Sequence, residues 1–179
     1  MPFIETKIPG VIIFEPRIFT DERGYFFETY NEKVFNDAGI NAKFVQDNQS
    51  KSSYGVIRGL HFQKGEHAQA KLVRVLQGSV LDVAVDLRPG SATFGKHVAV
   101  ELSDVNNLQL FIPRGFAHGF SVLSKTAVFA YKCDNFYCKE SEGGVNCMDS
   151  DLGIDWQVPL ENACLSEKDK ILPRMKECF

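Results

Sequence analysis

Two stretches of this chain decide its fold: Gly59-Leu60-His61-Phe62-Gln63 and Pro113-Arg114-Gly115-Phe116-Ala117-His118-Gly119-Phe120. Each places a histidine among glycine and aromatic residues. Because successive side chains of a strand point to opposite faces, His61 and Gln63 share one face of their predicted strand. In the second stretch, His118 shares a face with the phenylalanine two residues to either side. His61 is therefore expected on a strand.

Short strands account for most of the remaining sequence. They are expected at residues 11–14, 24–29, 56–63, 71–76, 79–86, 97–102, 108–112, 119–123 and 126–133. The pair Gln77-Gly78 predicts a hairpin between two of them. Many short strands separated by glycine or proline turns indicate an all-β sandwich or closed barrel.

A single domain spanning residues 1–179 is the simplest organisation, because this length can bury most of its apolar surface. Helices are few. Asn31 predicts the cap of a short helix that ends at Ala38, and Ser166 predicts the start of another. The 20 basic and 23 acidic residues give a formal charge of -3, which argues against a general nucleic-acid-binding protein.

The first residues and the cysteines bear on the compartment. The chain starts without the basic residues and apolar run of a signal peptide, and no apolar stretch approaches the roughly 20 residues that cross a bilayer. The five cysteines are odd in number and include no Cys-x-x-Cys pair, so neither a zinc site nor a disulfide framework is indicated. We therefore expect reduced thiols, a cytoplasmic protein and no membrane partner.

Three side chains suit acid–base chemistry, and each also has a simpler structural interpretation. Imidazole exchanges protons near neutral pH, so His61 suits a general base, although a hydrogen-bonded core histidine is common. Lys71 lies in line with Val73 and Val75, which predicts an ammonium inside a partly apolar barrel, able to stabilise an enolate oxygen. A surface lysine is the alternative. Tyr131 could donate a proton opposite a base, or serve as a core aromatic.

Potential binding groups are scattered along the chain. Arg23, Arg58 and Lys168 could meet a diphosphate, or could be solvated surface charges. No glycine-rich phosphate loop is present, so side chains would have to hold the phosphates. The polar run at residues 46–50 is too dense for a strand core and fits either a loop or a hydrogen-bonding wall for a sugar or base.

The two opening stretches resemble the half-motifs of a cupin, a small double-stranded β-barrel. A metal-binding cupin offers His-x-His, a glutamate, and later Pro-x-Gly-x-x-His. Here Gln63 replaces the second histidine, and Lys71 stands at the glutamate position, seven residues before Gly78. Only His61 and His118 remain of the four ligands. Since an ammonium repels a metal cation, the resemblance implies an all-β, cupin-type jelly-roll barrel with no metal and no other cofactor.

Longer segments closely resemble the family of thymidine-diphosphate 4-keto-6-deoxyglucose 3,5-epimerases, the RmlC family. The similar segments are residues 21–28, 46–48, 57–63, 69–73, 78–88, 112–120 and 165–169. The Arg-Gly-Leu-His-Phe-Gln and Pro-x-Gly-Phe-Ala-His-Gly-Phe motifs are the specific ones among them. The resemblance implies a metal-independent isomerase that inverts C3 and C5 of a dTDP-linked 4-keto-6-deoxy sugar in deoxysugar biosynthesis.

The same resemblance implies roles for individual residues. His61 would be the base, oriented by Asp169. Tyr131 would be the acid across the sugar ring, and Lys71 would lie at the C4 carbonyl oxygen. The substrate-binding positions would be Arg23, Phe26, Glu28, Gln46, Asn48, Arg58, Gln63, His118, Tyr137, Glu142 and Lys168. Tyr137 would stack on the thymine ring. The family also forms homodimers by exchanging sheet edges, so a second copy is the expected protein partner.

The strand around Gly59 has to be irregular if these roles hold. Arg58 and His61 have opposite parity, so a regular strand would place Arg58 on the outer surface. A bend or bulge at Gly59 is therefore predicted.

Three other interpretations stay open. A single-site epimerase, or a 3,4-ketoisomerase, would share the base and the ketone-polarising group. A metal-dependent cupin oxygenase is disfavoured by Gln63 and Lys71. A noncatalytic sugar-binding cupin would bind a nucleotide sugar without proton exchange.

Overall fold

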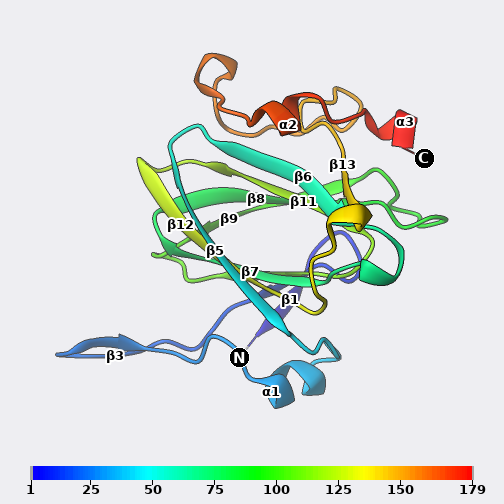
Figure 1. The fold of residues 1–179 in the computed structure, drawn as a ribbon. Coiled ribbons are helices and arrows are strands. Elements are labelled where there is room, and N and C mark those ends of the chain that lie inside the picture. Colours follow the sequence, from blue (N-terminus) through cyan, green and yellow to red (C-terminus); the bar gives the residue numbers. More distant parts are fainter. Residues whose placement is uncertain (1, 179) are drawn as a thin grey trace.

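A computed structural model describes residues 2–178, which form two antiparallel β-sheets that face each other (Figure 1). The strands are β1 (Phe3–Glu5), β2 (Ile12–Phe14), β3 (Phe19–Asp21), β4 (Gly24–Phe26), β5 (Gln46–Ser53), β6 (Ile57–Gln63), β7 (Lys71–Gln77), β8 (Ser79–Asp86), β9 (His97–Ser103), β10 (Gln109–Ile112), β11 (Phe116–Val122), β12 (Thr126–Cys133) and β13 (Glu142–Gly144). The helices are α1 (Glu32–Asp37), α2 (Glu167–Lys170) and α3 (Met175–Cys178), with 3-10 turns η1 (Gly65–His67), η2 (Lys139–Ser141) and η3 (Leu160–Asn162). The predicted all-β architecture with few short helices is confirmed.

The strand orders of the two sheets are β1-β2-β10-β7-β12-β5 and β13-β6-β11-β8-β9. Strands that follow one another in the chain often lie in opposite sheets, as in a jelly roll. The inward rows of both sheets form the main core, which includes Val73, Val80, Ala84, Leu110 and Phe129. The space between the two sheets is therefore largely apolar, and any polar side chain in an inward row lies among apolar ones.

The five-stranded sheet is covered on both faces. Its outer face packs under the segment from β13 to α3, and Val145, Leu152 and Trp156 of that segment join Ile57 and Leu81 in a second core. Figure 1 shows α2, α3 and the orange and red segments beside them lying over β6 and β11. As a result β8 and β11 are buried along almost their whole length.

The six-stranded sheet is covered at one end of its outer face by α1. Phe35 of this helix packs against Phe14 of β2 with ring centroids 4.9 Å apart. The helix begins as predicted, because the Asn31 side chain accepts hydrogen bonds from the N–H groups of Lys33 and Val34. Each helix within residues 2–178 is too short or too polar to cross a bilayer.

The predicted hairpin at Gln77-Gly78 is wrong. β7 pairs with β10 and β12, whereas β8 pairs with β9 and β11 in the other sheet. Gly78 has φ +83°, and a Cβ there would lie 2.1 Å from the Thr126 carbonyl oxygen. The glycine thus turns the chain tightly from one sheet to the other, which a sequence cannot distinguish from a turn within one sheet.

The polar run at residues 46–50 belongs to strand β5, so the first alternative, a loop, is wrong. β5 pairs only with β12, at the edge of its sheet, and its residues alternate between partly buried and exposed. An edge strand tolerates polar residues because one side of it is not packed against another strand. The run therefore supplies a polar wall to the barrel.

β3 and β4 form a separate two-stranded hairpin that projects from the barrel (Figure 1). β4 ends at Phe26, earlier than the strand expected at residues 24–29. The aromatic side chains of the hairpin lie in solvent, with exposed fractions of 52% for Phe19, 65% for Tyr25 and 71% for Phe26. Exposed aromatic groups of this density mark an interaction surface.

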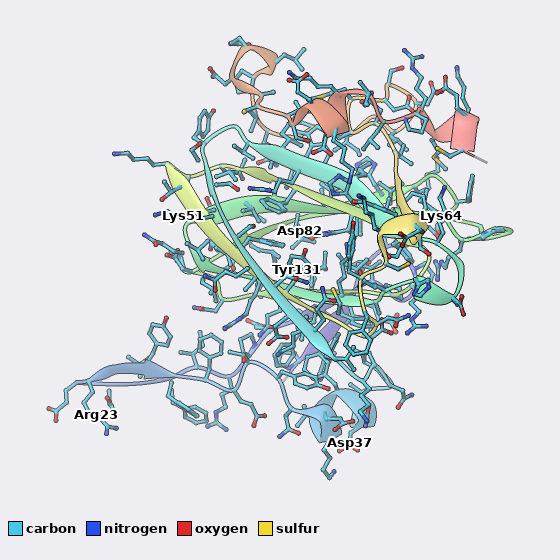
Figure 2. All side chains as sticks on the ribbon, in the orientation of Figure 1. Arg23, Asp37, Lys51, Lys64, Asp82 and Tyr131 are labelled. Carbon is cyan, nitrogen blue, oxygen red and sulfur yellow. The ribbon has the colours of Figure 1, made fainter. Side chains whose placement is uncertain are left out.

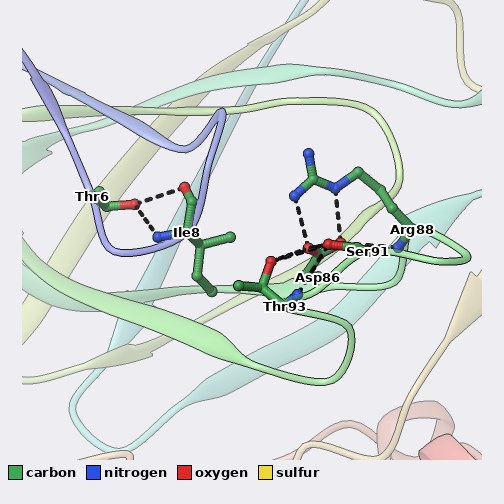
Figure 3. A network of polar contacts seen from close by, with 6 residues as sticks. All are labelled: Thr6, Ile8, Asp86, Arg88, Ser91 and Thr93. Atoms are coloured by element: carbon green, nitrogen blue, oxygen red, sulfur yellow. Dashed lines mark hydrogen bonds and ion pairs between the residues drawn. The ribbon is translucent and has the colours of Figure 1, made fainter.

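A polar network closes the loop that follows β8 (Figure 3). The buried Asp86 carboxylate accepts hydrogen bonds from Arg88 Nη2 at 2.7 Å, Ser91 Oγ at 2.7 Å and Thr93 Oγ1 at 2.6 Å. The Arg88 guanidinium also lies 4.6 Å from the centroid of the Phe116 ring. Burial by itself raises the pKa of Asp86, but these hydrogen bonds outweigh burial and hold the pKa well below its usual range.

We predict that Asp86→Asn lowers the free energy of unfolding at pH 7 by about 3 kcal/mol, because Arg88 loses its buried anion. Because the carboxyl pKa of Asp86 is lower in the folded protein than in the unfolded chain, the carboxylate stabilises the fold at pH values above its unfolded pKa of about 4. This stabilisation is lost as the pH falls through the pKa of the folded state. Urea unfolding at pH 7 and pH 3 should therefore show a smaller difference between wild type and variant at pH 3. Asp37→Asn, which removes an exposed partner of Lys33, is the matched control and should cost under about 0.5 kcal/mol. Equal losses in the two variants would contradict the prediction.

Candidate active site

A cavity of about 540 Å³ opens between the two sheets. Its wall is built from β5, β6, β7, β11, β12 and the segment that leads into α2. The predicted site residues that line it are Asn48, Arg58, His61, Lys71, His118, Tyr131, Lys168 and Asp169. The fold thus brings residues that are distant in the sequence to one open cavity.

His61 on β6 is paired with Asp169 on α2. His61 Nε2 lies 2.6 Å from Asp169 Oδ1, and the carboxylate is 5% exposed. The helix begins as predicted, because Ser166 Oγ accepts a hydrogen bond from the Asp169 N–H at 3.1 Å. A carboxylate accepts a hydrogen bond from the Nε2–H group, and this tautomer leaves Nδ1 with the free lone pair. The pair is therefore arranged as a base with a fixed tautomer.

Lys71 and Tyr131 enter the cavity from the opposite sheet. They lie on the neighbouring strands β7 and β12, and Lys71 Nζ is 5.8 Å from the centroid of the Tyr131 ring. The predicted inward direction of Lys71 is confirmed. Burial lowers the pKa of Lys71, and the nearby Cys133 and Asp82 oppose this in part. Burial raises the pKa of Tyr131, so its phenol keeps its proton at neutral pH.

His118 forms a second imidazole–carboxylate pair, with Asp82 of β8. His118 Nε2 lies 2.9 Å from Asp82 Oδ2, and both side chains are buried. Burial lowers the pKa of His118, and Asp82 offsets this in part. Asp82 was absent from the predicted site, although its position offered a signal. An aspartate in the middle of an otherwise apolar strand is rarely buried without a partner.

The predicted irregularity at Gly59 is confirmed. Across β11, the partners of Arg58 and His61 are two residues apart, although Arg58 and His61 themselves are three apart along β6. The extra residue makes a bulge, and Gly59 adopts φ +128° there. Arg58 and His61 can therefore both line the cavity despite their opposite parity.

A chain of polar contacts runs along the rim of the cavity. The Gln46 amide donates to Asn48 Oδ1 at 3.2 Å and accepts from the Tyr137 N–H at 3.0 Å. The Tyr137 hydroxyl donates to Glu142 at 3.3 Å, and Glu142 forms an ion pair with Lys168. Gln46, Tyr137 and Glu142 thus connect two residues of the cavity wall without lining it themselves.

Four predicted binding residues are not brought to this cavity. Gln63 is buried, and its side-chain oxygen accepts the Cys138 N–H at 2.9 Å, which is a structural role. Arg23 and Phe26 belong to the β3–β4 hairpin, and Glu28 follows it and accepts a hydrogen bond from Asn31. Figure 2 shows Arg23 near the far end of the hairpin, well away from the barrel.

The donor set at the cavity does not fit a metal ion. His61 and His118 each direct Nε2 to a carboxylate, and an ammonium group at Lys71 repels a cation. Within residues 2–178, no three or more His, Cys, Asp or Glu side chains come together in a way that could hold a metal. The groups present are those of proton transfer.

A jelly-roll barrel with two imidazole–carboxylate pairs, a lysine and a tyrosine around one cavity defines a cupin-type acid–base enzyme. A model of the dTDP-4-dehydrorhamnose 3,5-epimerase family matches residues 5–177. The dTDP-4-dehydrorhamnose 3,5-epimerase of Shigella flexneri is 55% identical over 170 residues, which cover 94% of this chain and 93% of that protein.

Solved structures agree with this match. The dTDP-4-dehydrorhamnose 3,5-epimerase from Elizabethkingia anophelis superposes with a TM-score of 0.96 at 62% identity, covering 99% of this chain and 97% of that one. RmlC from Legionella pneumophila, solved in complex with dTDP-4-keto-L-rhamnose, gives 0.94 at 49% identity, with coverage of 98% and 93%. The chain belongs to the dTDP-4-dehydrorhamnose 3,5-epimerase family, which consists of isomerases.

We predict that Gly59→Ala lowers the free energy of unfolding by at least about 2 kcal/mol and removes catalytic activity, because the bulge cannot hold a side chain. A Cβ at this position would lie 2.6 Å from Gly119 Cα and 2.9 Å from the His118 carbonyl oxygen. Gly90→Ala is the matched control, since Gly90 also has positive φ but nothing lies within 4 Å of its Cβ position. Thermal unfolding and turnover measure both effects, and a Gly59 variant no worse than the control would overturn the prediction.

Proposed function

We propose that this protein inverts C3 and C5 of dTDP-4-keto-6-deoxy-D-glucose to give dTDP-4-keto-L-rhamnose, without a metal or other cofactor, in deoxysugar biosynthesis. One observation carries the proposal. His61 lies on the five-stranded sheet and Tyr131 on the six-stranded sheet, and both line one cavity. Inversion requires a proton to leave one face of the sugar and return to the other, which asks for a base and an acid on opposite walls.

His61 removes the proton in this mechanism. The C4 ketone acidifies the protons on C3 and C5, and the electron pair of the broken C–H bond moves into an enolate. His61 takes the proton on the ring nitrogen that does not face Asp169, and the carboxylate stabilises the resulting imidazolium. The Lys71 ammonium stabilises the negative charge on the enolate oxygen, and such an electrostatic contribution is worth on the order of 3 kcal/mol.

Tyr131 returns a proton to the opposite face of the ring. Burial raises the pKa of the phenol, so the tyrosinate left after proton transfer readily recovers a proton. The proton held by His61 leaves to solvent, and the enzyme returns to its starting state. The same groups then act at the second carbon, with the ketone at C4 adjacent to both.

The polar rim suits the nucleotide. Besides Lys71, the cavity wall carries the cations Arg58 and Lys168, and we assign these two to the diphosphate. Tyr137, with an exposed fraction of 52%, offers a ring face to the thymine. Gln46 and Asn48 supply hydrogen bonds from the β5 edge.

The test is proton exchange in deuterated water with dTDP-4-keto-6-deoxy-D-glucose, read by NMR. Wild type should place deuterium at C3 and C5, with inverted product trapped by a downstream reductase. His61→Ala should lose exchange by at least about 100-fold while still binding dTDP, because a general base contributes that much. Tyr131→Phe should still remove protons but accumulate little inverted product.

His67→Ala and Tyr30→Phe are matched controls, because neither residue lines the cavity. Both should behave as wild type. Label at one carbon would reduce the activity to a single-site epimerase, and folded wild type that incorporates no label would sink the proposal.

We further propose a homodimer in which the β3–β4 hairpin of one copy reaches the cavity of the other. A two-stranded hairpin is marginally stable alone, and this one carries exposed aromatic residues. Arg23 has a side chain that is 84% exposed. Arg23, Phe26 and Glu28 would then act on the nucleotide in trans, which accounts for their distance from their own cavity.

Heterodimers test this arrangement. Arg23→Ala/Phe26→Ala and His61→Ala should each be inactive as homodimers. Co-expressed and purified through two different tags, the mixed dimer should regain about half of wild-type activity, because one of its two sites has both an intact cavity and an intact hairpin. A mixed dimer as inactive as its parents, or a fully active hairpin variant, would rule out the hairpin acting in trans.

The cysteine side chains bear on the compartment. All five cysteines are unpaired in the structure. We propose that the protein works in the cytoplasm, where thiols remain reduced.

A further inference from the structure

Asp82 is a buried carboxylate to which the mechanism above gives no role. Its inward row on β8 also contains Val80 and Ala84 of the main core. Oδ2 contacts His118 Nε2, but Oδ1 is the one buried side-chain nitrogen or oxygen within residues 2–178 that has no hydrogen-bond partner. Leaving a buried carboxylate oxygen unpaired is costly, so its retention needs an explanation. In Figure 2 Asp82 lies between the two sheets, as Tyr131 does.

Lys71 is a cation in the same core that lacks a hydrogen-bond acceptor among the described residues. Its inward row on β7 contains Val73 and Val75 of the same core. Its ammonium lies over the Tyr131 ring and, in the part of the chain that the structure describes, makes no hydrogen bond or ion pair. The barrel interior therefore holds a cation without an acceptor and a carboxylate oxygen without a donor, on facing sheets.

Titratable groups from four strands face Lys71. They are Asp82 on β8, His118 on β11, Tyr131 and Cys133 on β12, and Arg58 and His61 on β6. His61 is paired with Asp169. Burial raises the pKa of Cys133 to about 11 and raises that of Tyr131, so both are neutral at pH 7. Burial also favours a neutral His118. Asp169 is engaged by His61, which leaves Asp82 as the counter-charge.

We propose that Asp82 is a positioning residue that keeps the Lys71 ammonium charged and directed into the cavity, while its second oxygen holds the His118 imidazole. An uncharged amine at Lys71 could not stabilise an enolate, and burial works against the charge. A single buried anion between the two groups offsets that cost for Lys71 and fixes the orientation of His118. The catalytic part of this inference rests on the proposed function, but the electrostatic part does not.

The first test follows the titration of Lys71 directly. Protein labelled with ¹³C at lysine Cε is titrated by NMR, and the Lys71 signal is identified by its loss in Lys71→Met. In Asp82→Asn the pKa of Lys71 should fall by about 1 unit or more, because an opposite charge stabilises the ammonium. An unchanged titration in a folded Asp82→Asn protein would overturn the proposal.

Two further variants separate charge from structure. Glu101→Gln removes an exposed carboxylate on β9, and His118→Gln removes the other partner of Asp82 while keeping its charge. Both should leave the Lys71 titration within about 0.3 unit of wild type, since neither removes the charge that acts on it. If Asp82→Asn does not fold, Asp82→Ser is titrated in its place, and an unchanged Lys71 titration in that variant would overturn the proposal.

Kinetics provides the readout that ties Asp82 to the reaction. In Asp82→Asn we expect kcat to fall at least about tenfold with little change in KM, and the alkaline limb of the kcat profile to move to lower pH. The direction follows from the chemistry, because an ammonium with a lowered pKa loses its proton at lower pH. A fall in kcat without movement of that limb would reduce Asp82 to a structural residue. Wild type without any proton exchange would sink the proposed function alone, since the NMR titration needs no substrate.

Discussion

The contact between the His61 imidazole and the Asp169 carboxylate is the interaction on which the rest of the site depends. It joins residues 108 positions apart in the sequence. Asp169 is held there by a short helix, and the segment that carries this helix is packed on the outer face of the five-stranded sheet through Leu152 and Trp156. Apolar packing outside the barrel therefore decides the orientation of the His61 imidazole inside it.

A second constraint is the cost of charge inside an apolar barrel. Lys71, Asp82 and His118 each interrupt an apolar inward row, on β7, β8 and β11 respectively, and Asp86 ends the β8 row in a separate network with Arg88. Each of the three stands where an apolar side chain would otherwise continue the row, so the strands keep their pairing while the barrel interior gains polar groups. Lys71 stands where a metal-binding cupin has a glutamate ligand. A lysine at this position thus changes the chemistry of the barrel without changing its strand framework.

Much of the site could be predicted because strand parity is a local property. The inward direction of Lys71 followed from counting residues along one strand. The bulge at Gly59 followed from the same count together with the roles that the family resemblance implied for Arg58 and His61. The turn at Gly78 was misjudged because a glycine turn looks the same whether it joins strands of one sheet or of two. The pairing of Asp82 with His118 depends on which strands become neighbours, and no local pattern records that. For Arg23, the resemblance implied a binding role, but no local pattern could show that its hairpin projects away from the cavity of its own chain.

The two walls of the cavity differ in how they are covered. The wall that carries His61 has packed side chains on both faces, whereas the wall that carries Tyr131 ends in the edge strand β5 and is covered by α1 only at one end. We therefore expect amide protons of the buried strands β8 and β11 to exchange with solvent only when most of the molecule opens, and those of the edge strand β5 to exchange through local fluctuations. His61 therefore stands on a rigid wall and Tyr131 on a more compliant one. A pyranose ring that changes its pucker as its stereocentres invert would lie between one rigid wall and one wall that can move with it.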